Sequence, residues 1–323
     1  MPTVWMISCG HFLFIIILVM NGLDGMVMKK LTSIILFTAG LAILSGCLEI
    51  ETPENRIEKP ETEQTAVYKI VAHRGGSAEC KDPDCSVASL KYAISQNCYA
   101  SEADIVLTGD NDILICHPNG NGQVNGLDPA THTLAQIRAA GNLSNGEPIP
   151  TLTDFLKIVM DKKLNPNGMK LWLDVKRLAD AERSINACLR ASEIISGVNA
   201  QNYCEFLIPT GEDIFMAVRD RVINEYKINI AWMTCTNPAK YADPKDYGKV
   251  WAQLAYRKIL GDNPESSYRP LDYFNAGLPL SIAGVDDDKT MADVIPYYPK
   301  LKAIFTNYPA KLISKLREQK YID

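Results

Sequence analysis

The sequence predicts an α/β protein whose main domain, residues 66–323, is a closed (β/α)8 barrel of the TIM type. Three observations support this prediction. Short apolar runs alternate with amphipathic stretches of helical period along the whole domain, which indicates a parallel sheet covered by helices. The domain has the length that is typical of such a barrel. A doubly wound sheet is the alternative, but no Gly-x-Gly-x-x-Gly motif follows the first apolar run.

Nine apolar runs are candidate strands, one more than the barrel requires. The excess lies in the pair Ala100–Leu107 and Ile113–Cys116, because the five residues that join them are too few for a crossover helix. The nine runs are Lys69–Ala72, Ala100–Leu107, Ile113–Cys116, Leu171–Val175, Cys204–Ile208, Ile228–Met233, Val250–Leu254, Leu280–Ala283 and Lys302–Phe305. The candidate helices include Val87–Ser95, Leu134–Ala140, Thr153–Lys162, Ala181–Ile195, Glu212–Glu225, Met291–Tyr297 and Ala310–Glu318.

Residues 1–47 are expected to be a leader that directs export. Lys29-Lys30 precede an apolar run from Ile34 to Leu44, as in a secretory signal peptide. The end of this segment, Leu44-Ser45-Gly46-Cys47, resembles the bacterial lipobox, in which the cysteine is lipidated. A transmembrane helix is the alternative, but so short a run does not span about 30 Å of hydrocarbon.

The segments on either side of the signal complete the expected organisation. A second apolar stretch, Val4–Met20, lies upstream, and we expect translation to begin at Met26 or Met28. Residues 48–65 contain six glutamates and two prolines without apolar periodicity, so they are expected to tether the barrel to its anchor. The chain is therefore expected to be an exported lipoprotein of the cell membrane or the outer membrane.

Composition excludes some classes of partner. The net charge of −5 and the pI near 5.5 provide no basic surface, so no nucleic acid is expected to bind, and no protein partner is predicted. The barrel domain holds seven cysteines and no Cys-x-x-Cys pair, which argues against a structural zinc site. Cys80 and Cys85 are close enough in sequence to bridge a short loop, while Cys116 and Cys204 are expected to be buried thiols.

Polar residues occupy the predicted strands and their ends, where barrel enzymes place catalytic groups. His73 and Arg74 end the first strand, and His117 ends the run Ile113–Cys116. Glu102 and Asp104 lie two positions apart in one strand, so both side chains point to the same face. The two histidines can serve as general base and general acid near neutral pH, in an order that the sequence leaves open.

A third carboxylate and a lysine share a face of a later strand, Asp174 and Lys176. In the barrel lumen the carboxylates of Glu102, Asp104 and Asp174 would repel one another and lose their hydration, so they need a cation. Their oxygens suit a hard divalent metal, Ca²⁺ or Mg²⁺. Arg74 can hold a phosphate group through two parallel hydrogen bonds. The sequence therefore predicts a metal site that acts on a phosphate ester.

The order of these motifs resembles the glycerophosphodiester phosphodiesterase family over nearly all of residues 71–316. The motifs that carry the resemblance are His73-Arg74-Gly75, Glu102-x-Asp104, His117, Ile149-Pro150-Thr151-Leu152, Asp174-Val175-Lys176 and Phe305-Thr306-Asn307-Tyr308-Pro309.

The resemblance implies metal-dependent hydrolysis of a glycerophosphodiester to glycerol 3-phosphate and an alcohol. It assigns the metal to Glu102, Asp104 and Asp174 and the proton transfers to His73 and His117. It places phosphate binding at Arg74, with Lys176 beside it. The nucleophile is either water or the neighbouring glycerol hydroxyl, and attack by the hydroxyl would form a cyclic phosphate first.

Four departures from the family pattern lie around this cluster. Pro83-Asp84-Cys85-Ser86 replaces Pro-Glu-Asn-Thr, Asp174 replaces a glutamate, and Pro118 replaces an aspartate. Leu280-Ser281-Ile282-Ala283-Gly284 stands where an aromatic Trp-Thr stretch is usual. We therefore expect an altered alcohol pocket. Two alternatives remain: a sphingomyelinase-D-like lyase that releases a cyclic phosphate, against which the intact His-Arg-Gly argues, and a lipoprotein that binds phosphodiesters without turnover.

Overall fold

The computed structural model describes residues 4–9, 12–17 and 67–323, apart from residues 177–179, 210, 236, 247, 263 and 265. The chain divides into two units, Met1–Glu63 and Gln64–Asp323. In the first, β1 (Val4–Cys9) pairs antiparallel with β2 (Phe12–Ile17). The predicted lipidation site Cys47 and the predicted linker 48–65 lie outside the described residues. No helix of the described segments combines the length and apolarity that crossing a membrane requires.

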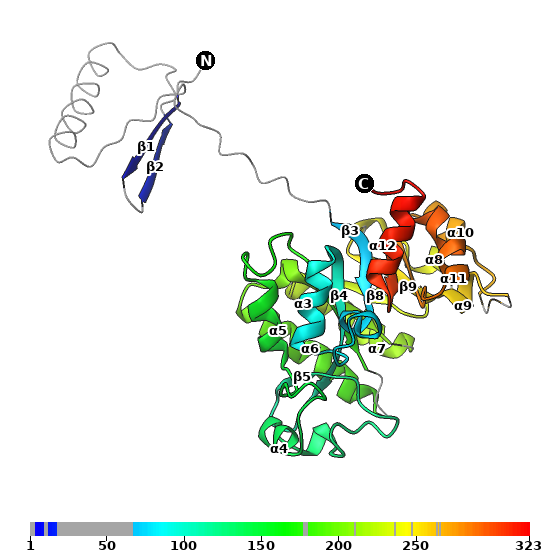
Figure 1. Cartoon of the computed structure of the whole chain (residues 1–323). Helices are drawn as coiled ribbons and strands as arrows, with labels where there is room; N and C mark the ends of the chain where they lie inside the picture. The colour runs from blue at the N-terminus through cyan, green and yellow to red at the C-terminus, as the bar shows by residue number, and fades with distance from the viewer. Residues whose placement is uncertain are drawn as a thin grey trace, which may run out of the picture. The chain divides into compact units, whose positions relative to one another are not determined.

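The second unit is a closed barrel of parallel strands surrounded by helices, as predicted (Figure 1). Its sheet runs in the order β3-β11-β10-β9-β8-β7-β6-β4, and pairing of β4 with β3 closes the ring. The barrel strands are β3 (Tyr68–Ala72), β4 (Cys98–Leu107), β6 (Lys170–Val175), β7 (Cys204–Ile208), β8 (Asn229–Trp232), β9 (Val250–Ala255), β10 (Leu280–Ala283) and β11 (Ala303–Thr306).

The ninth predicted strand is β5 (Ile113–Ile115), which pairs antiparallel with the last part of β4. Thr108 organises the short connection, because its backbone N–H donates to the carbonyl of Asp112 at 2.9 Å and its hydroxyl donates to Asp110 at 2.6 Å. The two strands form a hairpin at the C-terminal rim of the barrel, so β5 adds no crossover and leaves the eightfold ring intact.

Helices follow most of the strands and cover the outside of the barrel. The longer ones are α3 (Val87–Ser95), α4 (Leu134–Ala139), α5 (Leu152–Val159), α6 (Ala181–Gly197), α7 (Glu212–Asp220), α11 (Asp288–Val294) and α12 (Pro309–Glu318). Side chains of Ser86, Thr151 and Asp287 each accept the backbone N–H of the third residue of α3, α5 and α11, which fixes where these helices begin. The short helices α2 (Ser77–Cys80), α8 (Pro238–Tyr241), α9 (Tyr256–Ile259) and α10 (Pro270–Asn275) were not predicted.

Alternation along each strand divides the core into two layers. In β6, Leu171, Leu173 and Val175 face the helices and belong to the large outer core, whereas Trp172 belongs to a separate cluster inside the barrel. Trp172 packs there against Trp251, with ring centroids 5.1 Å apart. The same alternation directs Asp174 inward, above these aromatic rings.

The cysteines of this unit are free thiols. Cys85, Cys116 and Cys204 are buried, and Cys80 is half-buried. A bridge between Cys80 and Cys85 is therefore not formed, while the expectation of buried thiols at Cys116 and Cys204 is confirmed. Burial raises the pKa of the Cys116 thiol to about 12, so this thiol stays protonated and behaves as an apolar residue.

Candidate active site

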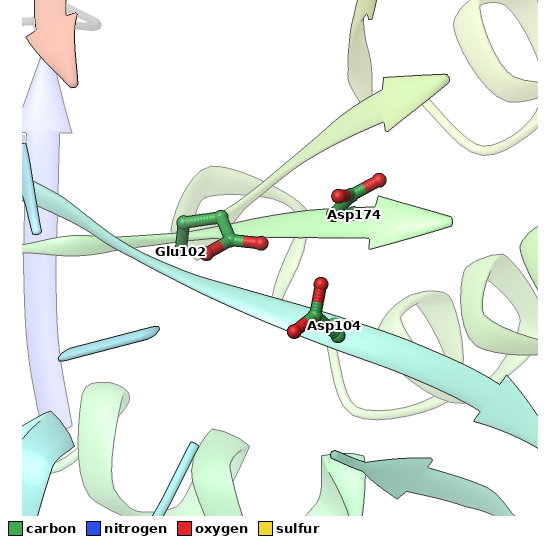
Figure 2. A group of neighbouring side chains, drawn as sticks. All are labelled: Glu102, Asp104 and Asp174. Carbon is green, nitrogen blue, oxygen red and sulfur yellow. The ribbon is translucent and has the colours of Figure 1, made fainter. Parts of the chain in front are cut away.

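Three carboxylates from neighbouring strands gather at the C-terminal end of the barrel (Figure 2). Glu102 and Asp104 project from the same side of β4, and Asp174 projects from β6, where it pairs in register with Asp104. All three side chains are buried, and one oxygen of each lies within 4.8 Å of the others. The spacing of two along β4 and the adjacency of β6 thus produce the cluster that the sequence predicted.

Burial and mutual repulsion make this cluster costly without a cation. Burial raises the pKa of Glu102 well above its usual range, and the charges of Asp104 and Asp174 raise it further. Burial also raises the pKa of Asp174. The ammonium of Lys176 lies 2.5 Å from Asp104 Oδ1 and 2.6 Å from Asp174 Oδ2. Burial alone would lower the pKa of Lys176, but these two carboxylates outweigh it and raise the value.

The donor set suits a hard divalent cation. Its members are carboxylate oxygens from one face of two adjacent strands, which are the ligands that Ca²⁺ and Mg²⁺ take. Asp104 Oδ1 is buried, and the ammonium of Lys176 lies 2.5 Å from it. This ammonium provides at the cluster the kind of positive charge that a divalent cation would supply. The residues present therefore fit the predicted metal.

A tight turn after β3 brings the backbone and side chain of Arg74 to these carboxylates. Arg74, Gly75 and Gly76 have φ angles of 47°, 83° and 77°, a left-handed run that reverses the chain within three residues. A side chain at Gly75 is excluded, because a Cβ there would lie 2.4 Å from Ser89 Oγ. The Arg74 N–H donates to Glu102 Oε2 at 3.0 Å, and Arg74 Nε lies 2.9 Å from Asp104 Oδ2.

Asp84 holds the other side of the Arg74 guanidinium. Its Oδ2 accepts from Arg74 Nη1 at 2.8 Å, and its Oδ1 accepts from the hydroxyl of Ser77. Burial alone would raise the pKa of Asp84, but these two hydrogen bonds lower it. Asp84 belongs to the loop that departs from the family pattern. The sequence shows this departure, but no role was predicted for Asp84.

His73 is oriented by residues from the far end of the chain. Its Nδ1 lies 2.7 Å from Asn307 Oδ1. Asp286 accepts from the Asn307 backbone N–H at 2.7 Å and from Asn307 Nδ2 at 2.9 Å, so the amide oxygen must face the imidazole. This arrangement assigns the proton to His73 Nδ1 and leaves a lone pair on Nε2, which lies 3.8 Å from Glu102 Oε2. Burial and then the charge of Arg74 lower the pKa of His73, which keeps it neutral at pH 7.

Neither Asn307 nor Asp286 was predicted to take part. The only signal in the sequence was their place just after the runs that became β10 and β11, together with the motif around Asn307. Polar residues at the C-terminal ends of barrel strands are the group from which site residues come.

His117 reaches the site along β5 rather than at the end of a barrel strand. The backbone N–H of Cys116 donates to the carbonyl of Asp104 at 3.0 Å, which fixes the next residue at the rim beside the carboxylates. His117 is exposed, and its charge interacts with those of Asp104 and Arg74. Although the residue is exposed, protein atoms around the ring displace part of its water, and this desolvation lowers the pKa of His117 below the usual value of 6.5. His117 thus follows a strand, as predicted. That strand, β5, runs antiparallel to β4 and is not one of the eight barrel strands.

Two cavities flank the barrel. One of about 340 Å³ adjoins Asp174 and Lys176 at the C-terminal end. The larger one, of about 580 Å³, is lined by Lys69, Trp251 and Lys302 at the N-terminal ends of the strands, away from the carboxylates. Of these two cavities, the smaller adjoins the carboxylate cluster.

No protein-family model and no curated protein sequence matches this chain. Among solved structures, it is similar to a glycerophosphodiester phosphodiesterase from Parabacteroides distasonis, with 23% identity over 79% of this chain and 99% of that one and a TM-score of 0.64. It is also similar to an Oleispira antarctica phosphodiesterase solved with its product sn-glycerol-3-phosphate, with 20% identity, coverage of 78% and 97%, and a TM-score of 0.56. A Thermotoga maritima glycerophosphodiester phosphodiesterase matches at 16% identity, coverage of 77% and 98%, and a TM-score of 0.52. The chain therefore has the barrel fold of the solved glycerophosphodiester phosphodiesterases.

Proposed function

We propose that this protein is a metal-dependent phosphodiesterase that hydrolyses a glycerophosphodiester to glycerol 3-phosphate and an alcohol. One observation carries the proposal: three buried carboxylates, two histidines and two cations meet at the end of the barrel where catalytic residues lie. The fold shared with solved glycerophosphodiester phosphodiesterases supports it. The Oleispira protein, which was solved with sn-glycerol-3-phosphate, supports the choice of product.

The charges of the cluster favour a phosphodiester monoanion as substrate. Glu102, Asp104 and Asp174 carry three formal negative charges, against two positive charges on Arg74 and Lys176. With a divalent cation bound, these five side chains and the cation would carry one net positive charge. Asp84 balances that charge through its pairing with Arg74 until the single negative charge of a phosphodiester takes its place. A divalent cation held by these carboxylates supplies Lewis-acid polarisation of a phosphoryl oxygen.

The geometry suits His73 for the role of general base. Because Nδ1 donates to Asn307, Nε2 has a lone pair and can take a proton from the attacking water or glycerol hydroxyl. The imidazolium that results has Glu102 Oε2 3.8 Å from Nε2. His117, on the exposed rim, would give a proton to the alkoxide oxygen as the P–O bond breaks. The negative charge of the bound phosphodiester favours the protonated form of His117.

Arg74 and Lys176 are placed to bind the phosphate. Both cations lie within 3 Å of Asp104, so a phosphoryl group at the carboxylate cluster is within their reach. Arg74 would exchange its contact with the half-exposed Asp84 for the substrate. Its left-handed backbone holds the guanidinium at the site before substrate arrives.

The test uses purified chain and a set of glycerophosphodiesters, assayed with chelator and then with added Mg²⁺ or Ca²⁺. We expect turnover that chelator abolishes and metal restores, and a loss of at least about a hundredfold in kcat for His117→Ala. Turnover that chelator does not affect would exclude the metal, and an unaffected His117→Ala variant would exclude the assigned acid. Phosphorus NMR of the products separates hydrolysis from a lyase, which would leave a cyclic phosphate. Binding without turnover would identify a phosphodiester-binding protein.

We also propose that the chain is exported and anchored to a membrane through a lipid on Cys47. The signal-like segment that ends in Leu44-Ser45-Gly46-Cys47 and the acidic tether that follows it support this proposal. Cells that express the wild type should incorporate labelled fatty acid into the protein and retain it in the membrane fraction. Cys47→Ser should take up no label and should leave the membrane fraction. Label that persists in this variant would refute the assignment.

A further inference from the structure

The larger of the two cavities, at the N-terminal ends of the barrel strands, has no role in the proposed reaction. Its volume of about 580 Å³ lies in the range of small-molecule sites. Trp251 of β9, Phe274 of α10 and Leu278, which precedes β10, supply apolar surface to its lining. Trp251 also belongs to the cluster inside the barrel, so the cavity extends from the rim to the inner core. This part of the lining suits the carbon skeleton of a small organic ligand.

Three lysines supply the charged part of this lining. Lys69 belongs to β3, and Lys300 and Lys302 lie in the segment that leads into β11. Every other described residue of the lining is uncharged, so no carboxylate is among them. A concave surface with charges of one sign concentrates ions of the opposite sign. The lining of this cavity therefore attracts anions.

Lys69 and Lys300 have neutral partners. The Lys69 ammonium donates to the backbone carbonyl of Pro299 at 3.1 Å. The Lys300 ammonium lies 6.0 Å from the centre of the Phe274 ring. Neither lysine forms an ion pair with any residue that the structure describes, so no acidic side chain compensates these two charges.

Lys302 connects the cavity to the buried carboxylate of Glu205. Its ammonium lies 3.3 Å from Glu205 Oε1 and 4.3 Å from the centre of the Trp251 ring. The ammonium of Lys170 lies 3.2 Å from the same oxygen, so one carboxylate serves two lysines. Burial lowers the pKa of Lys302, and the single charge of Glu205 does not offset this effect. An anion in the cavity would supply the negative charge that this pair of lysines lacks.

We propose that this cavity binds a phosphate ester, whose phosphate is held by Lys69, Lys300 and Lys302 and whose organic part packs on the apolar lining. Three ammonium groups around one space suit a group with several anionic oxygens, and lysine binds such oxygens as a point charge. The head group of an anionic phospholipid and a soluble phosphate monoester both present this chemistry. The inference does not depend on the proposed phosphodiesterase function, because the cavity lies at the other end of the barrel from the carboxylates.

Calorimetric titration of the purified full chain tests the proposal and separates the two sources. The probes are glycerol 3-phosphate, dihexanoylphosphatidylglycerol and the zwitterionic dihexanoylphosphatidylcholine, each added with chelator. We expect glycerol 3-phosphate, the phosphatidylglycerol or both to bind, and Lys69→Gln/Lys300→Gln to raise the dissociation constant at least about tenfold. Lys91→Gln/Lys157→Gln, which removes two exposed lysines of α3 and α5, is the matched control and should bind as the wild type does.

The pattern of binding decides the inference. Weaker binding of the phosphatidylglycerol alone identifies a lipid head group, and weaker binding of glycerol 3-phosphate alone identifies a soluble ester. Binding that the lysine variant retains in full belongs to the catalytic cluster and would overturn the inference, as would the absence of binding or an equal loss in the control pair. Equal affinity for the two lipids would attribute their binding to the acyl chains.

Two further measurements keep this inference apart from the proposed function. Unfolding curves of both double variants show whether a loss of affinity comes from misfolding. The lysine variant should hydrolyse glycerophosphodiesters with the kcat/KM of the wild type, because its substitutions lie away from the catalytic cluster. A chain that hydrolyses no diester but binds these probes through the three lysines would disprove the phosphodiesterase function alone.

Discussion

The imidazole of His73 depends on a residue 234 positions away in the sequence. Asp286 accepts two hydrogen bonds from Asn307, and this fixes the amide oxygen of Asn307 against His73 Nδ1. Phe305 packs against the other part of the ring, with centroids 5.1 Å apart. The tautomer and the direction of His73 are thus set by β11 and the residues after β10, although the histidine itself belongs to the turn after β3.

Replacing Asn307 should therefore impair the reaction without removing a group that touches the substrate. We expect Asn307→Ala to lower kcat about 10²-fold, because His73 loses its orientation and its assigned tautomer. Asn307→Asp restores an acceptor, and the new carboxylate should raise the pKa of His73 and move the acid limb of the pH–rate profile to higher pH. Asn142→Ala, in an exposed loop, is the control. A loss of kcat in Asn307→Ala that unfolding of the protein fully accounts for would contradict the positioning role.

The pH dependence of the reaction follows from the two histidines. Burial lowers the pKa of both His73 and His117 below 6.5, so each is neutral at pH 7 in the free protein. His73 must be neutral to accept a proton and His117 must be protonated to give one, so kcat/KM should follow a bell. It should rise as pH falls from 8 toward the lowered pKa of His117, and it should decrease at still lower pH as His73 becomes protonated. The measurement is kcat/KM between pH 5 and 8 at saturating metal. An acid limb centred above 6.5 would show that the base is another group.

At the scale of the strands, the buried carboxylate of Glu205 links the N-terminal ends of several barrel strands. Glu205 of β7 accepts from Trp172 Nε1 at 2.7 Å and from Asn229 Nδ2 at 3.2 Å, and Lys170 and Lys302 lie 3.2 and 3.3 Å from it. These partners come from β6 and β8 and from the residue before β11. Burial alone would raise the pKa of Glu205, but the two lysines outweigh it and lower the value.

We expect Glu205→Ala to destabilise the barrel by about 3–5 kcal/mol, because two lysines and the neutral donors of Trp172, Asn229 and Tyr99 lose a common buried acceptor. Since the folded pKa of Glu205 is lowered, its contribution is present above the unfolded value near 4.5 and is lost as pH falls through the folded value. Urea unfolding at pH 7 and pH 4 measures both effects, and kcat per folded molecule should not change because the site lies at the other end. Glu193→Ala, on the exposed face of α6, is the control. Equal stability of the two variants would sink this assignment.

For the whole molecule, the sequence was sufficient for the barrel and insufficient for the network that orients its site. Strands such as β6 are buried on both faces, so they appear as apolar runs, and inward polar residues such as Asp174 stand out in them. The direction of β5 is set by its antiparallel pairing with β4, and the apolar pattern of the sequence does not indicate which strands pair. The contact of His73 with Asn307 arises only when β11 closes beside β3, and no local spacing encodes it. The short helix α9, four residues long, is below the length at which a helical period can be recognised.

The site as a whole opposes the stability of the metal-free fold. The raised pKa of Glu102 means that the folded chain holds a proton there more tightly than the unfolded chain does. Ionised Glu102 therefore destabilises the fold above the raised value, and this cost disappears as pH falls toward the unfolded value near 4.5. A cation bound by Glu102, Asp104 and Asp174 would offset the same cost, because its positive charge compensates the carboxylates. Since it would bind only the folded chain, it would stabilise the fold.

Three changes in thermal unfolding should follow, and Glu102→Gln should raise the stability of the metal-free protein while it lowers the stabilisation by metal. Mg²⁺ or Ca²⁺ at a hundred times its dissociation constant should stabilise the wild type by about 2.7 kcal/mol. Glu102→Gln keeps an acceptor for the Arg74 N–H but removes the charge, so we expect the metal-free variant to be more stable than metal-free wild type by about 1 kcal/mol. This difference should grow as pH rises from the unfolded pKa near 4.5 to the raised folded pKa of Glu102. The same variant should lose most of the stabilisation by metal. Calorimetric scans with chelator and with each cation measure all three quantities, with Glu193→Gln as the control for a lost surface charge. A metal-free Glu102→Gln protein that is less stable than wild type, yet responds fully to metal, would place the cation outside this cluster.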